Sequence, residues 1–126
     1  MARFFWICFA GALGTGARYL IGLGTIRALG AAFPWGTLCV NVLGCFLIAG
    51  VMRAASVQPW ISPDLRFALT TGFLGGLTTY SSFNYETTRL FEDRGWTFAA
   101  LNLGVTLGSC VIAGLLGTLA ARRLFG

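Results

Sequence analysis

The chain has 126 residues, of which 56% are hydrophobic and 10% charged, and its mean hydropathy is +0.77. Soluble domains carry about 25% charged residues, so this composition excludes an ordinary soluble domain and leaves too little polar chain for a second one. The formal charge of +5 comes from nine arginines and four acids, but the arginines stand near the ends of apolar segments, as membrane anchors do, which argues against a nucleic-acid partner.

The apolar segments predict an all-α membrane protein with a single domain, residues 1–126, made of four transmembrane helices. About 20 mostly apolar residues in a helix cross the hydrocarbon core of a bilayer. The predicted spans cover approximately residues 4–26, 35–52, 66–91 and 96–121. Arg53 closes the second span, and Arg122 and Arg123 end the fourth.

The second span carries a polar stripe. Thr37 and Asn41 are four residues apart and therefore share one helical face. An asparagine near the middle of a membrane is costly unless it faces a partner or a wet path, and its amide offers two hydrogen-bond donors. These two residues are candidates for the lining of a polar path.

The third span has the composition of a broken helix. Eleven residues between positions 66 and 90 are Gly, Ser or Thr, so this segment does not face lipid along its length. The pair Gly75 and Gly76 weakens the helix, and the two threonines that follow can satisfy freed backbone groups. We predict a break near residues 75–79, where unwound carbonyls can coordinate a cation. The alternative is that the paired glycines only permit close helix packing.

Aromatic and hydroxyl side chains follow the expected break. Tyr80 and Phe83 share a helical face, and Ser81 and Ser82 supply donors beside them. The positive edge of an aromatic ring favours an anion in the plane of the ring. Aromatic residues at this spacing also serve as plain packing, which is the alternative interpretation.

The fourth span has a similar stripe of Asn102, Thr106 and either Ser109 or Cys110. Together, the second, third and fourth spans are predicted to line a narrow path that is rich in donors and nearly free of acids. Donors without carboxylates suit an anion.

The distribution of arginine between the two sides is nearly balanced. The side with both termini is expected to hold Arg3, Arg53, Arg66, Arg122 and Arg123, and the other side Arg27, Arg89 and Arg94, with Arg18 if it reaches the interface. Orientation in a membrane follows a clear Lys/Arg excess on one side. Two readings stay open: the chain inserts in both orientations and pairs one copy of each, or the small excess fixes one orientation.

The second and third spans resemble those of the Fluc (CrcB) fluoride channels. The matching runs are G-T-L-x-V-N from Gly36 to Asn41 and G-F-L-G-G-L-T-T-Y-S-S-F from Gly72 to Phe83, with Arg18 before an aromatic residue. The resemblance covers the whole chain in length, spans and motif order. It implies a fluoride-selective channel of the plasma or inner membrane, through which fluoride leaves the cell passively so that its toxicity is reduced.

The resemblance also implies an antiparallel, dual-topology homodimer in the lipid bilayer, with a structural Na⁺ that is not transported. By motif, the sodium ligands are the backbone carbonyls of Gly75 and Thr78. Tyr80 stands where the family has phenylalanine, and Ser82 where it has threonine. The motif, the polar stripes and the resemblance together give these expected pore or fluoride residues: Arg18, Thr37, Asn41, Tyr80, Ser81, Ser82, Phe83, Asn102, Thr106 and Ser109.

Two other classes of function fit the sequence less well. A small multidrug exporter is also a short dual-topology protein, but it needs a carboxylate in its first span, and the only acid inside a predicted span is Glu86 in the third. An enzyme needs a nucleophile with a base or a metal. The chain has no histidine, and its four cysteines lie in apolar segments without a CxxC pair, so they are expected to behave as small hydrophobic residues.

Overall fold

The protein is described here by a computed structural model that covers residues 1–126 and contains helices and no strands. Three helices are long and apolar enough to cross a membrane: α1 (Ala2–Leu29), α2 (Trp35–Val57) and α6 (Trp96–Phe125). They correspond to the first, second and fourth predicted spans. Only 17 of the 126 residues are buried within one chain, so most apolar side chains are left to face lipid or another protein surface.

The second helix is longer than predicted. Arg53 does not close α2, which continues for another turn to Val57. The helix ends where Gln58 adopts an extended conformation, because Gln58 precedes Pro59 and the proline ring disfavours helical geometry at the residue before it.

The third predicted span consists of several helical pieces, in place of one long helix. These are α3 (Pro63–Phe67), the π-helical segment η1 (Ala68–Leu74), α4 (Gly75–Leu77) and α5 (Tyr80–Arg94). Ser62 is the amino-terminal cap of α3: its hydroxyl accepts a hydrogen bond from the Leu65 N–H at 3.2 Å.

The interruption between α4 and α5 is shorter than predicted. Thr78 and Thr79 have extended backbone conformations, so the break lies inside the expected range. The prediction that Gly75 and Gly76 are themselves unwound is wrong, because both belong to α4.

The glycines on this side of the break allow close packing against α1. A Cβ atom built on Gly76 would collide with the carbonyl oxygen of Gly11, and one built on Gly14 would collide with that of Phe73. A Cβ on Gly72 would lie 2.7 Å from the carbonyl oxygen of Ile7. The packing interpretation therefore holds for Gly76 and not for Gly75, where a Cβ would meet only the Thr70 carbonyl oxygen at 3.7 Å. Gly14 and Gly72 likewise allow α1 and η1 to approach closely.

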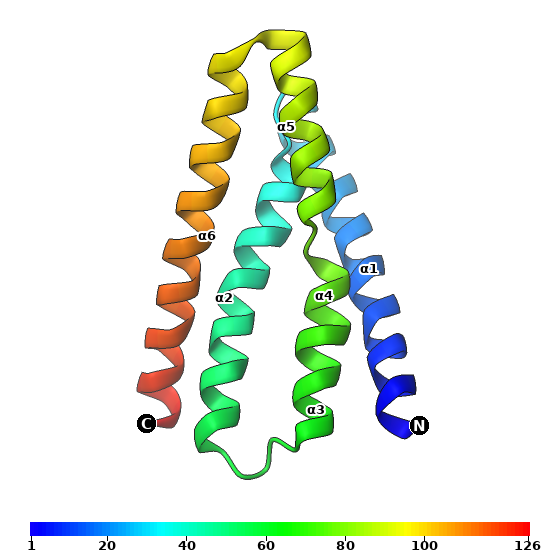
Figure 1. Ribbon diagram of the computed structural model, residues 1–126, viewed down its shortest axis with the longest axis vertical. Helices are drawn as coiled ribbons and strands as arrows, with labels where there is room; N and C mark the ends of the chain where they lie inside the picture. Colours follow the sequence, from blue (N-terminus) through cyan, green and yellow to red (C-terminus); the bar gives the residue numbers. More distant parts are fainter.

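The two halves of the broken segment contact different partners. Both η1 and α4 pack on α1, whereas α5 packs on α6, and α2 makes its largest contact with α6. Figure 1 shows that residues 63–94 run from the end of the molecule where α2 finishes to the end where α6 begins. Both chain termini consequently lie at one end, opposite the turn between α5 and α6.

That turn consists of Gly95 alone. Its φ of 86° lies in the left-handed region, which a glycine adopts without the steric penalty of a Cβ atom. The predicted spans left residues 92–95 between them, but α5 continues to Arg94 and only Gly95 separates it from α6.

Candidate functional site

The break is held in place by an asparagine of the second helix. The Thr79 N–H donates to Asn41 Oδ1 at 2.8 Å, and Asn41 Nδ2 donates to the Thr79 carbonyl at 3.0 Å. One side-chain amide thus satisfies both backbone groups of a residue that lies outside regular helix. We refer to this pair of hydrogen bonds as the Asn41–Thr79 clamp.

The clamp also changes the hydrogen bonding of α4. In a continuous α-helix the Thr79 N–H would bond to the Gly75 carbonyl four residues earlier. Since Asn41 takes that donor, the Gly75 carbonyl loses its usual helical partner. The Thr78 carbonyl accepts from Arg18 of α1 at 3.3 Å, so a charged side chain from a third helix also reaches the break.

The amino-terminal end of α5 gathers hydroxyl groups. Thr79 is its cap: the Thr79 Oγ1 accepts from the Ser82 N–H at 3.2 Å and donates to the Ser82 Oγ at 3.1 Å. The Ser81 Oγ lies 3.3 Å from the same Thr79 oxygen. A helix amino terminus carries partial positive charge, so this end of α5 combines oriented N–H groups with three hydroxyls.

An inner cavity of about 360 Å³ lies against the break. Its walls include Asn41, Gly75, Phe83, Thr106 and Cys110, which come from four helical elements. It brings together residues that the sequence placed on three separate spans.

The two aromatic residues after the break differ in exposure. Phe83 is 4% exposed and Tyr80 is 75% exposed within one chain, although both contact the inner cavity. Their ring centroids lie 5.8 Å apart with a tilt of 57°. The predicted aromatic pair is therefore a direct contact, with Phe83 on its packed side and Tyr80 on its open side.

An outer cavity of about 470 Å³ lies on the other side of the clamp, toward the end with the α5–α6 turn. It is lined by Arg18, Thr37, Thr79, Ser82 and Glu86, among others. Thr79 contacts the outer cavity and its partner Asn41 contacts the inner one, so the Asn41–Thr79 clamp separates the two cavities.

Glu86 lines the outer cavity, although the sequence pattern of hydrogen-bond donors did not predict it as a site residue. The Thr37 hydroxyl donates to Glu86 Oε1 at 2.8 Å, whereas Glu86 Oε2 is buried without a hydrogen-bond partner in the chain. The Thr37 donor, predicted to line an anion path, is thus engaged by a carboxylate. The signal available in sequence was the presence of an acid inside an otherwise apolar and hydroxyl-rich span.

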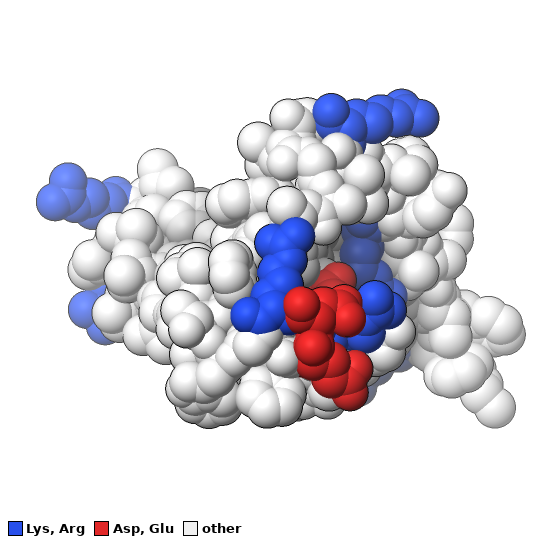
Figure 2. Space-filling view, turned by 90° about the horizontal axis from the view of Figure 1, so that it is seen from above, with Lys and Arg blue, Asp and Glu red and all other residues white.

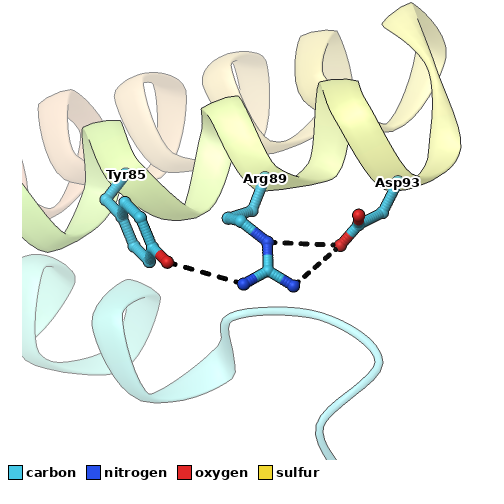
Figure 3. Close-up of polar contacts among 3 residues, drawn as sticks. All are labelled: Tyr85, Arg89 and Asp93. Carbon is cyan, nitrogen blue, oxygen red and sulfur yellow. Dashed lines mark hydrogen bonds and ion pairs between the residues drawn. The ribbon is translucent and has the colours of Figure 1, made fainter.

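The rim of the outer cavity carries an ordered charged network. Arg89 donates to Asp93 Oδ2 at 3.1 Å and reaches the Tyr85 hydroxyl at 3.5 Å, and all three residues lie one turn apart on α5 (Figure 3). Figure 2 shows acidic side chains close beside basic ones at this end of the molecule. The mouth of the cavity is therefore of mixed charge.

Comparison with known proteins places the chain in a family. The family model described as CrcB-like protein, Camphor Resistance (CrcB), matches residues 5–118. The chain belongs to the CrcB-like family.

Relatives in the same family cover nearly the whole chain. A protein of Sorangium cellulosum is 48% identical over 124 residues, 98% of each chain, and one of Anaeromyxobacter sp. is 49% identical over 126 residues, all of each chain. A protein of Geobacter sulfurreducens is 48% identical over 114 residues, 90% of this chain and 92% of the relative. Each relative is named fluoride-specific ion channel FluC. With its long apolar helices, this CrcB-like chain is a multi-pass membrane protein.

The polar residues predicted on the fourth span of this CrcB-like protein have different roles: some contact the inner cavity, and others bond to neighbouring parts of the protein. Asn102 donates to the Thr87 hydroxyl at 2.8 Å and fixes α6 against α5, and Thr106 contacts the inner cavity. The Ser109 hydroxyl bonds only to carbonyls of its own helix and does not contact the inner cavity. Of the two residues left open by the sequence, Cys110 is the one on the cavity wall.

Proposed function

We propose that the chain is a fluoride-selective ion channel of the cell membrane, which lets fluoride leave the cell passively and so reduces its toxicity in the cytoplasm. The observation that carries this proposal is the 48–49% identity, over nearly the full length, with relatives named fluoride-specific ion channel. The chemistry of the break supports it, because hydroxyl groups and N–H donors gather at the start of α5, beside the clamp that separates the two cavities.

Passage of fluoride requires protein groups that replace the hydrogen bonds of water. Ser81 and Ser82 provide hydroxyls at the positive end of α5, the Phe83 ring borders the inner cavity, and Arg18 lines the outer one. Conduction needs contacts that are favourable enough for entry and weak enough for release. Neutral hydroxyls and ring edges in series meet this condition better than a tight charged pocket.

Reconstituted liposomes test the proposal directly. With a potassium gradient and valinomycin to balance charge, liposomes that contain the chain are expected to release fluoride quickly and chloride very slowly. A fluoride electrode and a chloride electrode measure the two rates, and liposomes without protein provide the background. Equal release of both anions, or none above background, would contradict the proposed function.

The same experiment separates the channel from the alternative function. A small multidrug exporter exchanges protons for organic cations and would acidify or alkalinise the liposome interior as cations move. No observation favours this exporter, since Glu86 lies in the third predicted span and is hydrogen-bonded to Thr37. A channel for fluoride is expected to run down a gradient without any such exchange.

The fourth crossing and the dimer are parts of the proposal. Residues 63–94 connect opposite ends of the molecule, which supports a fourth crossing by the broken segment. The near balance of arginine supports insertion in both orientations and an antiparallel homodimer. A second chain would also cover part of the large apolar surface that one chain leaves exposed.

We expect a tag at the carboxyl terminus to be accessible from both sides of the native membrane in comparable amounts. Impermeant labelling of intact and opened vesicles measures the two populations. A variant with several lysines added after Gly126 serves as the control, because a strong charge excess on one side is expected to fix one orientation. A single orientation of the unmodified chain would refute dual topology.

A structural Na⁺ near the break is consistent with the residues present. The Gly75 carbonyl lacks its usual helical partner, it is among the last carbonyls of the helical run from η1 through α4, whose carboxyl end is negative, and Gly75 borders the inner cavity together with Thr78. The Thr78 carbonyl accepts a single long hydrogen bond from Arg18, which leaves a lone pair for a cation. Carbonyl oxygens are hard ligands that suit Na⁺, so Gly75 and Thr78 would hold it, with further ligands from the second chain.

Removal of sodium is expected to lower the thermal stability of the purified dimer and, over time, its fluoride conduction. Replacement of Na⁺ by N-methylglucamine at constant ionic strength tests this, with unfolding followed by intrinsic tryptophan fluorescence. Liposomes that pass fluoride are expected to show no flux of radioactive sodium. Unchanged stability and lasting activity without sodium would argue against the site.

A further inference from the structure

Two of the four cysteines meet across the contact between α2 and α6. Cys45 and Cys110 are both half-buried, and both lie on the wall of the inner cavity. Cys8 and Cys39 are exposed and contact neither cavity. Burial and a shared cavity wall therefore distinguish this pair from the other two thiols.

The backbone geometry places these thiols together independently of side-chain orientation. A Cβ atom built on Gly114 would lie 3.8 Å from the Cys45 carbonyl oxygen, so these positions of α2 and α6 are adjacent. Cys110 is one turn before Gly114 on the same face of α6. Because α2 and α6 run in the same direction and side chains lean toward the helix amino terminus, the Cys45 side chain leans toward Cys110.

The chemistry of the pair selects a narrow class of ligand. Thiolates are soft ligands that favour ions such as Cu(I), whereas tetrahedral zinc needs four ligands. No group of three or more metal-binding Cys, His, Asp or Glu side chains exists in the chain, so two sulfur atoms are the whole set. A pair of thiols without further ligands suits a soft cation of low coordination number.

We propose that Cys45 and Cys110 form a two-thiol site for a soft d¹⁰ cation of the Cu(I) class. Binding forms two metal–sulfur bonds and releases one proton from each thiol, and no electrons are transferred. The bound ion joins α2 to α6 on the wall that also carries Phe83 and Thr106. It therefore reduces ion passage through the inner cavity, a consequence that rests on the proposed channel function.

Hg(II) is a suitable probe of this site in the purified full-length chain. Three variants are compared with the unmodified chain: Cys45→Ala, Cys110→Ala, and the double change Cys8→Ala with Cys39→Ala. Bound mercury is measured after gel filtration, and alkylation of each cysteine by N-ethylmaleimide is mapped by peptide mass spectrometry. Thermal unfolding of each metal-free variant shows that it is folded.

After gel filtration in excess glutathione, which removes mercury held by a single thiol, the unmodified chain and the double variant are expected to retain one Hg(II) that protects both Cys45 and Cys110 from alkylation. Linking two ligands in one site raises affinity through effective concentration, so loss of either cysteine is expected to weaken retention about 100-fold. Undiminished retention by Cys45→Ala or Cys110→Ala, or protection of only one thiol, would overturn the site.

Inhibition of fluoride efflux by Hg(II) is the second measurement. Hg(II) is expected to inhibit efflux through the Cys8/Cys39 double variant and to leave efflux through Cys45→Ala unaffected. Mercury bound to both thiols without inhibition would overturn the effect on conduction. If the metal-free chain passes no fluoride at all, the proposed function fails, while retention and alkylation still decide whether the two-thiol site exists.

Discussion

Replacing Asn41 by alanine is expected to abolish fluoride conduction and to destabilise the fold. The change removes both hydrogen bonds of the Asn41–Thr79 clamp and leaves two backbone groups of a residue that is 8% exposed without partners. An unsatisfied buried polar group costs about 1–3 kcal/mol, so the two groups together are expected to lower the free energy of unfolding by about 2–6 kcal/mol. Fluoride efflux and chemical unfolding in detergent measure the two effects.

Two further variants make the interpretation of this result specific. Asn41→Asp keeps an acceptor for the Thr79 N–H but loses the donor, so it is expected to retain more stability than Asn41→Ala while conducting poorly because of its negative charge. Asn84→Ala is the matched control, since Asn84 is exposed and surface changes usually alter stability by less than about 0.5 kcal/mol. Normal efflux through Asn41→Ala would show that the clamp is not needed for conduction.

Phe83→Ile is expected to reduce fluoride efflux by more than about tenfold, which corresponds to an increase of roughly 1.4 kcal/mol in the barrier. The substitution keeps an apolar side chain in a site that is 4% exposed, but it removes the aromatic edge from the wall of the inner cavity. Phe5→Ile, at a position that is 68% exposed on α1, is the matched control and is expected to conduct normally. Unfolding curves distinguish lost conduction from lost structure.

Tyr80→Phe is expected to have a smaller effect on fluoride efflux than Phe83→Ile. Tyr80 is on the open side of the aromatic pair, so its ring is retained in this variant and only the phenolic donor is lost. A hydrogen bond to a charged group is worth about 1.5–3 kcal/mol, and we expect turnover to change several-fold. Conduction identical to that of the unmodified chain would show that the phenol has no place in the path.

The two aromatic variants are interpreted together. Full efflux through Phe83→Ile would exclude a role for the ring pair.

The long helices could be predicted from the sequence because hydropathy and length alone determine them. The structure of the third segment was harder to predict, because a glycine can either weaken a helix or allow close packing of two helices. The sequence identified the Gly75–Gly76 pair as a weak point, but whether a glycine unwinds or packs depends on its neighbours in the fold, and Gly76 is helical and packs against Gly11 of α1. The break moves to the two threonines, where Asn41 satisfies the backbone.

The candidate site, too, could be predicted from the sequence only in part. A helical stripe predicts which side chains share a face, but it does not reveal which of them bond to one another. The Thr37 donor is taken by Glu86, and Asn41 is engaged by the backbone of Thr79, because α5 brings these partners from more than 30 positions away. Ser109 and Cys110 were indistinguishable because neighbours on a helix differ by about 100° in direction, and only the position of α2 selects Cys110.

The separate partners of the two half-helices have a consequence for biosynthesis. As the chain leaves the ribosome, α1, α2 and residues 63–77 contain all the surfaces on which η1 and α4 pack, so this part is expected to assemble first. The following helix, α5, carries three acids and two arginines and is not apolar enough to enter a bilayer unaided. Its insertion therefore waits for α6, the last helix made, and a chain that terminates near Gly95 is expected to be degraded although most of its residues are present.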